Sequence, residues 1–359
     1  MKPTRVAVAG CGSIAVSGHL PACRAAAEAG LCELVGVCDI VPERAQSVSR
    51  EYGAPAFGTV AEMLSGTGPD VLVITTFPDS HRELTLQGFS SGCHVLCEKP
   101  VAMNTAEAAQ MVSAAEEAGR LLSVCFQYRH WDESVWLKER IAGGALGHVH
   151  SIRTWGGGVH GFATNPDYHR VARAGGGVLA HWTIHNLDLA LWLLDHPEPV
   201  TASAFCHQRL AAAPEALGPS LDVVDPGAVE PGIEDFATAF VRLEGSAVIT
   251  VEADWLQAPS ERHEGWEILG ERGAASLSPL RFRIVKDGSW VDDGPPPGTL
   301  APSDYGMERL YTAFLETVRS GGPAPVTGAE ILRIQRLMDA LYESAALGRE
   351  VPVKAPSNE

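Results

Sequence analysis

The first third of the chain alternates short apolar segments with helical segments, and this alternation constrains the fold more than any other feature. The apolar segments read as strands at residues 5–9, 33–38, 70–75, 94–97 and 121–126. The segments between them have helical patterning, at residues 14–30, 42–52, 80–91 and 105–118. Strands that are apolar along their whole length and alternate with helices indicate a parallel sheet covered on both faces. We therefore predict an α/β fold with a doubly wound nucleotide-binding domain over residues 1–128.

A glycine-rich turn joins the first strand to the first helix, with the sequence Gly10-Cys11-Gly12-Ser13-Ile14-Ala15. In a strand–turn–helix context, Gly10 allows the tight turn, Gly12 lets a phosphate approach the backbone, and Ala15 lets the helix pack closely. The amino end of a helix also attracts phosphate. We predict that Gly10, Gly12, Ser13 and Ile14 bind the pyrophosphate of a dinucleotide.

Asp39 follows the second strand, where a carboxylate can accept hydrogen bonds from both ribose hydroxyls of NAD. The same charge opposes a 2′-phosphate, by about 4 kcal/mol at ~4 Å and an effective dielectric of about 20. Ile40 comes next, and the nearest basic residue is Arg44. We predict NAD rather than NADP, with Asp39 and Ile40 beside the ribose. A purely structural role for Asp39, capping the helix after it, is the alternative.

The pattern changes after residue 128. Longer strand candidates follow one another at residues 148–155, 200–207, 234–243, 247–255, 266–269 and 282–285, with a helix at 179–194. Residues 235–242 alternate with the period of an antiparallel strand that is buried on one face. We predict a second, α+β domain over residues 129–359 with an open, mainly antiparallel sheet. A partner subunit could cover its free face as a homodimer or homotetramer. Residues 211–231, rich in Pro, Gly and Ala, read as a surface connection.

Two segments carry candidate catalytic groups. Lys99 follows an apolar strand, and Pro100 restricts it to extended geometry. Near a cationic nicotinamide ring its pKa would fall, which suits proton exchange with a substrate hydroxyl. His181 and His185 follow three glycines, at residues 175–177, that would let the backbone approach a ligand. The i, i+4 spacing puts both histidines on one face of a helix.

Each of these groups has a plainer interpretation. Lys99 can be a solvated lysine paired with Glu98, and the histidines can be core or capping residues. Two histidines at i, i+4 also suit a metal, but the sequence has no His-Glu-x-x-His pattern, and we expect no metal.

Composition restricts the partners and the compartment. The net charge is −17, from 27 basic and 44 acidic residues, which opposes binding to nucleic acid and to anionic membranes. No apolar run approaches the ~20 residues that span a bilayer, and the start shows no signal-peptide pattern. The chain has eight cysteines without a Cys-x-x-Cys pair, so we expect reduced thiols and a cytoplasmic protein.

Together these motifs resemble those of the Gfo/Idh/MocA oxidoreductase family. The resemblance covers nearly the whole chain and includes the glycine turn, residues 76–81, Glu98-Lys99-Pro100, residues 175–188 and residues 344–351. It implies an N-terminal Rossmann domain and a C-terminal domain whose open sheet makes dimer or tetramer contacts. It also implies NAD(P)-dependent oxidation or reduction of a sugar, inositol or sugar-nucleotide carbon.

The resemblance assigns roles to individual residues. Lys99 matches the catalytic lysine and His185 the catalytic histidine. The stretch that lines the cofactor riboses corresponds to Thr75, Thr76, Phe77, Pro78 and His81, and the positions beside the nicotinamide to Glu98 and Gln127. Placement alone suggests substrate contacts for Arg129, Trp155, Tyr168 and Arg170, together with His181 and His185.

The chain departs from the family pattern at one place. The family has an aspartate four residues before the histidine and a glycine two before it, where this chain has His181 and Thr183. A histidine can donate or accept a proton but adds no fixed negative charge. The proton relay is then either His181 with His185, or Lys99 alone. A redox-assisted glycosidase and a non-enzymatic NAD-binding regulator are alternative functions, and the presence of both Lys99 and His185 argues against the regulator.

Overall fold

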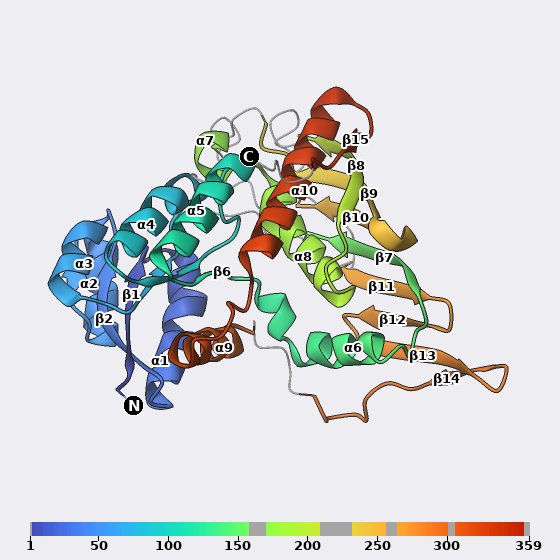
Figure 1. Ribbon diagram of the computed structural model, residues 1–359, viewed down its shortest axis with the longest axis horizontal. Coiled ribbons are helices and arrows are strands. Elements are labelled where there is room, and N and C mark those ends of the chain that lie inside the picture. The colour runs from blue at the N-terminus through green and yellow to red at the C-terminus, as the bar shows by residue number, and fades with distance from the viewer. Residues whose placement is uncertain (1, 158–169, 209–231, 256–263, 301–305, 355–359) are drawn as a thin grey trace, which may run out of the picture. The chain divides into compact units, whose positions relative to one another are not determined.

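The computed structural model of the protein describes residues 2–157, 170–208, 232–255, 264–300 and 306–354. The chain divides into two compact units (Figure 1). Unit 1 comprises Met1–His130 and Asp304–Leu332, and unit 2 comprises Trp131–Ser303 and Arg333–Glu359.

Unit 1 contains a six-stranded parallel sheet in the order β3-β2-β1-β4-β5-β6, the strand order of a dinucleotide-binding fold. Its strands are β1 (Thr4–Ala9), β2 (Cys32–Cys38), β3 (Ala56–Phe57), β4 (Val71–Ile74), β5 (His94–Cys97) and β6 (Leu122–Val124). Its helices are η1 (Ala15–His19), α1 (Leu20–Glu28), α2 (Pro42–Tyr52), α3 (Val60–Thr67), α4 (Pro78–Ser90), α5 (Thr105–Ala118), η2 (Gln127–His130) and α9 (Met307–Ser320). The predicted doubly wound domain is confirmed.

Two details of unit 1 differ from the prediction. The predicted helix at residues 14–30 is a π-helical turn, η1, followed by α1. The short elements β3 and α3 were not predicted, because a strand of two residues and a helix of eight carry too little periodic pattern.

The C-terminal part of the chain returns to unit 1. One face of α9 buries Leu310, Tyr311, Phe314 and Leu315 in the same hydrophobic cluster as the buried face of α1. Asp304–Leu332 therefore belongs to unit 1, whereas the sequence analysis assigned every residue after 128 to the second domain. The apolar face of α9 was visible in the sequence, but its partner was not, because α1 lies almost 300 positions away.

Unit 2 contains a nine-stranded sheet in the order β14-β13-β12-β11-β7-β10-β9-β8-β15. Only the β7–β10 pair is parallel among the described strand pairs, so the predicted mainly antiparallel sheet is confirmed. The strands are β7 (Val149–Gly156), β8 (Pro199–His207), β9 (Phe236–Leu243), β10 (Val248–Asp254), β11 (Gly265–Gly270), β12 (Gly273–Leu277), β13 (Arg281–Lys286), β14 (Ser289–Asp292) and β15 (Val351–Pro352).

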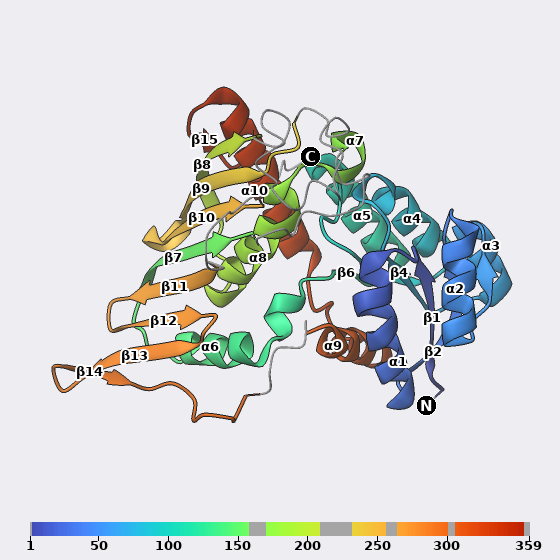
Figure 2. The same cartoon turned by 180° about the vertical axis from the view of Figure 1, so that it is seen from behind.

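The helical segments of unit 2 are α6 (Asp132–Ala142), α7 (Val171–Ala174), η4 (Leu179–Thr183), α8 (Ile184–Leu193), η7 (Glu244–Ser246) and the main part of α10 (Gly328–Leu347). Of these, α6, α8 and α10 lie on one side of the sheet (Figure 2). Nearly every residue of α8 is buried, which fixes the segment that carries the histidines. The elements α6, α7, β12, β14 and β15 were not predicted from the sequence, and the predicted connection at 211–231 lies outside the described residues.

All eight cysteines are free thiols, and seven of them are buried. Within the described ranges, no helix combines the length and the apolar character that crossing a membrane requires.

Candidate active site

The turn between β1 and η1 places its two glycines in different surroundings. Gly10 has a φ of +99°, and a Cβ there would lie 2.7 Å from the carbonyl oxygen of Thr75. The Thr75 hydroxyl also donates to the carbonyl oxygen of Gly10, at 2.8 Å. By contrast, no described atom lies within 4 Å of a Cβ built on Gly12. The protein's own packing therefore requires Gly10, whereas Gly12 leaves open space in which a phosphate can approach the backbone.

Asp39 ties this turn to the segment after β2. Its Oδ2 accepts a hydrogen bond from the backbone N–H of Cys11 at 2.7 Å, and its Oδ1 accepts one from Val41 at 2.8 Å. A carboxylate has about four acceptor positions, so lone pairs remain for two ribose hydroxyls. Ile40, next to it, is 82% exposed. Asp39 thus both shapes the glycine turn and presents acceptor oxygens at the end of β2.

The segment after β4 is held by a fully buried histidine. His81 places Nδ1 2.9 Å from the carbonyl oxygen of Pro100 and Nε2 3.1 Å from that of Thr76. The Thr76 and Ser80 hydroxyls are hydrogen bonded at 2.7 Å. His81 therefore connects the turn at Thr76 with the residues after Lys99, and its ring nitrogens face backbone rather than open space.

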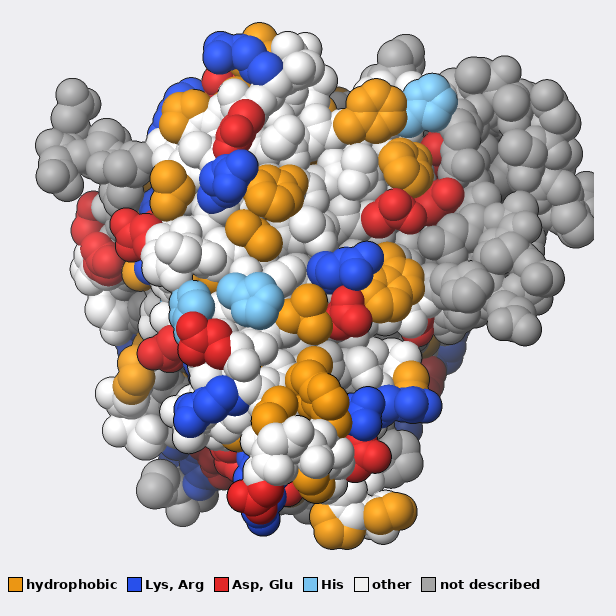
Figure 3. Space-filling view, turned by 90° about the vertical axis from the view of Figure 1, so that its right-hand side faces the viewer, with side chains coloured by type: hydrophobic (Ala, Val, Ile, Leu, Met, Phe, Trp, Pro, Cys, Tyr) orange, Lys and Arg blue, Asp and Glu red, His pale blue; other side chains and the backbone are white. Residues whose placement is uncertain are grey.

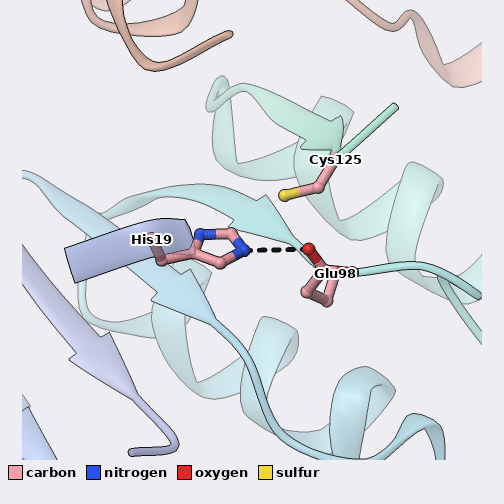
Figure 4. Close-up of side chains that lie close together, drawn as sticks. All are labelled: His19, Glu98 and Cys125. Atoms are coloured by element: carbon pink, nitrogen blue, oxygen red, sulfur yellow. Dashed lines mark hydrogen bonds and ion pairs between the residues drawn. The ribbon is translucent and has the colours of Figure 1, made fainter. Parts of the chain in front are cut away.

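Glu98, directly after β5, lies close to the side chains of His19 and Cys125 (Figure 4). Its Oε1 lies 2.8 Å from Nε2 of His19, and its Oε2 accepts the backbone N–H of Lys99 at 3.0 Å. The Cys125 thiol lies within 4.8 Å of this carboxylate, and burial together with the Glu98 charge raises the pKa of Cys125 well above its ordinary value. Glu98 is only 5% exposed, and its donors supply what a buried carboxylate requires.

Lys99 occupies the position that follows this carboxylate. It is partly buried, and burial lowers the pKa of its amine, while the nearby Glu98 charge opposes that shift. A lysine whose pKa is lowered exchanges protons near neutral pH more readily than a solvated one. The simple Glu98–Lys99 surface pair that the sequence allowed is not what the structure shows, because Glu98 is buried among its own donors.

Gln127 and Arg129 follow β6 in η2. Gln127 is buried, and its Oε1 has no hydrogen-bond partner among the described residues. A buried amide oxygen left in this way is a ready acceptor for a ligand donor such as a carboxamide. Arg129 is also buried, and its guanidinium lies 3.3 Å from Glu330, with the ring of Phe126 close by. Arg129 therefore already has partners inside unit 1.

Two of the three glycines at residues 175–177 serve the protein's own packing. A Cβ on Gly177 would lie 1.9 Å from the backbone oxygen of Glu234, and one on Gly176 would lie 1.9 Å from the hydroxyl of Tyr342. The Glu234 carboxylate accepts the N–H groups of Gly177 and Leu179, each at 2.9 Å, and the Tyr342 hydroxyl at 2.9 Å. The expectation that these glycines make room for a ligand is therefore corrected for Gly176 and Gly177: they make room for Glu234 and Tyr342.

The histidines lie across a junction between two helix types. His181 belongs to the π-helical turn η4, and His185 lies in the first turn of α8. The predicted single α-helix over 179–194 is therefore wrong in its first turn, where the π-helical turn changes the angular spacing. His185 is buried, and the ring of His181 stacks on Trp255, with ring centroids 6.3 Å apart.

Two of the remaining predicted substrate residues, Trp155 and Arg170, lie in the described part of unit 2. Trp155 lies on β7 with its ring over Gly265, where a Cβ would come within 2.6 Å of it. Arg170 is exposed just before α7, and Tyr168 lies outside the described residues.

Sequence reasoning missed four residues that organise these sites: His19 and Tyr311 in unit 1, and Glu234 and Tyr342 in unit 2. His19 is 79 positions from Glu98 and 292 from Tyr311, and Tyr342 is 108 from Glu234. No local spacing encodes such contacts. The one available signal was polarity, since His19 and Glu234 are polar residues beside apolar segments.

The parallel sheet, the glycine turn and the acceptor groups around it define an oxidoreductase with a Rossmann-type dinucleotide domain. Comparison with known families agrees. The family described as "Oxidoreductase family, NAD-binding Rossmann fold" matches residues 4–126, and "GFO/IDH/MocA C-terminal domain" matches residues 134–276. The chain belongs to the Gfo/Idh/MocA oxidoreductase family, as the motifs predicted.

Individual relatives match over most of the chain. The D-glucoside 3-dehydrogenase of Escherichia coli (strain K12) is 28% identical over 361 residues, with 97% of each protein covered. An inositol 2-dehydrogenase of Rubrobacter xylanophilus is 30% identical over 262 residues, covering 71% of this chain and 66% of the relative. A levoglucosan dehydrogenase solved with NADH and L-sorbose shares the fold, with a TM-score of 0.82 at 20% identity over 99% of this chain and 100% of that one.

Proposed function

We propose that this oxidoreductase oxidises or reduces a carbinol or ketone carbon of a sugar, a cyclitol or a derivative of one, with NAD as cofactor. The observation that carries the proposal is the partly buried Lys99 amine beside the Glu98 carboxylate at the end of β5. The relatives supply the substrate class, because dehydrogenases of a glucoside and of inositol match over most of their lengths.

The residues of unit 1 fit the cofactor. Open space beside Gly12 accommodates a pyrophosphate, Asp39 retains acceptor positions for ribose hydroxyls, and Gln127 has an unused buried oxygen. When bound, NAD accepts or returns a hydride. We assign cofactor contacts to these residues and to the neighbouring Gly10, Ser13, Ile14, Ile40, Thr75, Thr76, Phe77, Pro78, Glu98 and Lys99, with His81 holding the backbone at Thr76.

NAD is preferred over NADP in this proposal. The Asp39 carboxylate is fixed by the N–H groups of Cys11 and Val41, so it cannot swing away from a 2′-phosphate without breaking both hydrogen bonds. Two like charges ~4 Å apart repel by about 4 kcal/mol at an effective dielectric of about 20.

Proton transfer is assigned to Lys99 and His185. In the oxidation direction, the neutral Lys99 amine takes the proton of the reacting hydroxyl, which its lowered pKa favours. His185 acts as a second proton-transfer group, and His181 takes the place of the family aspartate. Arg129, Trp155, Tyr168 and Arg170 remain the proposed substrate contacts.

The protein is further proposed to be a cytoplasmic homo-oligomer. Exposed hydrophobic side chains on strands of the nine-stranded sheet, Val200, Phe205, Val285, Trp290 and Val291, suit contact with a second copy. Figure 3 shows this side of unit 2, where hydrophobic side chains lie among charged ones. Eight free thiols suit a reducing compartment. Light scattering of the purified protein tests the assembly, and a monomer at micromolar concentration would refute it.

A substrate screen tests the function. Sugars, cyclitols and glycosides are incubated with NAD and, separately, with NADP, and the near-ultraviolet absorbance of reduced nicotinamide is followed. We expect NAD reduction with one class of polyhydroxy substrate, its loss in Lys99→Met and His185→Ala, and normal turnover in the exposed-lysine control Lys2→Met. Release of an aglycone without net reduction of NAD would instead indicate a redox-assisted glycosidase. Binding of NAD without turnover of any substrate would indicate a regulator.

A further inference from the structure

A chain of buried polar groups leads from α9 to the backbone of Lys99. The Tyr311 hydroxyl lies 3.0 Å from Nδ1 of His19, and Nε2 of His19 lies 2.8 Å from Oε1 of Glu98. The other oxygen of Glu98 accepts the N–H of Lys99 at 3.0 Å. His19 and Tyr311 are each 1% exposed or less, so solvent cannot replace either of them. Every link lies within unit 1.

The direction of these hydrogen bonds follows from the groups at each end. Burial raises the pKa of Tyr311 well above its ordinary value, so the phenol keeps its proton and can donate it to Nδ1 of His19. Nε2 of His19 then carries the hydrogen that is donated to the Glu98 carboxylate. Tyr311 therefore donates to His19, and His19 donates to Glu98, so each hydrogen bond pairs one donor with one acceptor.

Local structure aims His19 at Glu98. His19 is the last residue of the π-helical turn η1, and inserted π-helical turns are frequent at functional sites. The glycine turn directly precedes η1, so one continuous segment contributes both the glycine turn and His19. Tyr311 is held by the hydrophobic cluster that α9 shares with α1, and the rings of Tyr311 and His19 meet edge to face, with centroids 5.7 Å apart.

We propose that His19 and Tyr311 are positioning residues, which hold the Glu98 carboxylate fixed against the backbone of Lys99 during proton transfer. The proposal rests on the assignment of Lys99 as the proton-transfer group. Glu98 in turn places a negative charge beside the Lys99 amine, so the orientation and the acidity of Lys99 both depend on a histidine from the phosphate-binding helix.

A metal ion is the competing explanation of the same cluster. His19, Glu98 and Cys125 are ligand types, and one ligand atom of each lies within 4.8 Å of the others. However, both ring nitrogens of His19 already face hydrogen-bond partners, and the raised pKa of Cys125 favours the thiol over the thiolate that binds metals. Hydrogen bonds therefore account for the cluster without a cation.

The expected pH effect has a defined sign. The groups that face Lys99 are Glu98 from β5 and Cys125 after β6, and Glu98 in turn faces His19, Tyr311 and the buried His81. Burial lowers the pKa of Lys99, and the charges of Glu98, first, and of Cys125 raise it. Loss of a donor to Glu98 disfavours the ionised carboxylate, so the Lys99 pKa falls. The acid limb of the oxidation rate should then move to lower pH by about one unit.

The test compares two substitutions of His19 and one of Tyr311. His19→Leu removes the donor to Glu98, His19→Gln restores an N–H donor of similar reach, and Tyr311→Phe removes one hydroxyl. We expect His19→Leu to lower kcat about tenfold and shift the acid limb, His19→Gln to recover part of both effects, and Tyr311→Phe to give a smaller shift in the same direction. The KM for NAD should change by less than about twofold in all three.

Matched controls separate positioning from general damage. His94→Asn removes a histidine from β5, the strand that precedes Glu98, and Tyr52→Phe removes a hydroxyl from α2. Both should keep the wild-type pH profile. If His19→Leu fails to fold, the pH profile of Tyr311→Phe provides the test, because that variant loses only one hydroxyl and keeps the packing of the ring.

Three results would overturn the inference. The first is wild-type kcat and pH profiles for His19→Leu and Tyr311→Phe when Lys99→Met is inactive. The second is the same kcat and the same pH profile in His19→Gln as in His19→Leu, which would mean that the N–H donor at position 19 has no effect. The third is a stoichiometric metal ion in the purified protein. Normal turnover of Lys99→Met would instead refute the assignment of Lys99 itself, which distinguishes failure of the function from failure of the positioning role.

Discussion

Two glycine-to-alanine substitutions distinguish a glycine required by the protein's own packing, Gly177, from a glycine proposed to make room for the cofactor, Gly12. In Gly177→Ala, the new methyl group would lie 1.9 Å from the backbone oxygen of Glu234, whereas ordinary contacts begin at 3.4 Å. In Gly12→Ala, the methyl group would meet no described atom within 4 Å, and the backbone there is outside the left-handed region. We therefore predict loss of stability from the first change and loss of NAD binding from the second.

The magnitude for Gly177→Ala follows from what must move. The backbone at Glu234 has to shift by roughly 1.5 Å, and overpacking of this kind costs about 1–3 kcal/mol. Three hydrogen bonds join Glu234 to residues 177–179, each 2.9 Å long and each contributing about 1 kcal/mol, and the shift weakens them. A total near 3 kcal/mol corresponds to a fall in Tm of roughly 10 °C.

The magnitude for Gly12→Ala follows from the phosphate contacts. Hydrogen bonds from backbone N–H groups to a charged phosphate contribute about 1.5–3 kcal/mol each. Holding the phosphate off by one methyl group should lose about one of them, which corresponds to a roughly 10- to 100-fold weaker Kd for NAD. The Tm without cofactor should stay within about 2 °C of the wild type.

The assay pairs thermal unfolding with an NAD titration followed by tryptophan fluorescence. Gly177→Ala should lose stability and keep most of its NAD affinity, because position 177 lies in unit 2 and the glycine turn in unit 1. Wild-type NAD affinity in Gly12→Ala, or an unchanged Tm in Gly177→Ala, would refute the reasoning.

Further predictions concern two carboxylates, Asp39 and Glu234, and one tyrosine, Tyr342. Asp39→Asn removes the charge that repels a 2′-phosphate, so the preference for NAD over NADP should fall by about tenfold or more in a comparison of kcat/KM. Glu234→Gln turns an amide N–H₂ toward a backbone N–H and should lower the free energy of unfolding by about 1–3 kcal/mol, measured with urea; an unchanged midpoint would contradict this. Because burial raises the pKa of Glu234, the folded state binds a proton before the unfolded state does, so the stability advantage of the wild type over Glu234→Gln should increase as the pH falls from 7 toward the ordinary carboxyl value. Tyr342→Phe should cost less than Glu234→Gln in the same experiment, because the two backbone donors to Glu234 remain.

Much of the architecture could be predicted because it depends on the hydrophobic pattern of short, continuous segments of the sequence. Apolar strands, helices between them and a glycine turn define the parallel sheet of unit 1, and alternation indicates the antiparallel sheet of unit 2. The short β3, β14 and β15 escaped prediction because they are held by pairing with a neighbouring strand rather than by a pattern of their own.

Candidate site residues could be predicted from the sequence where they belong to short local motifs. Asp39 and the pair Glu98-Lys99 could be singled out as candidates because they come at the ends of apolar strands of a parallel sheet. Their partners could not, since Tyr311 reaches the site from the far end of the chain. The glycines at 176 and 177 show a second limit: a sequence shows that a close approach occurs there, but not that the approaching groups belong to the protein itself.

The central claim is that the amine of Lys99 exchanges the substrate proton, and chemical rescue tests it most directly. Lys99→Ala is assayed by single-turnover NAD reduction with added primary amines of graded pKa. The account predicts that, at saturating NAD, the variant without amine is at least about 100-fold slower than the wild type. It also predicts that amines restore the rate in an order that follows their basicity. Near-normal hydride transfer in Lys99→Ala without any amine would contradict the claim.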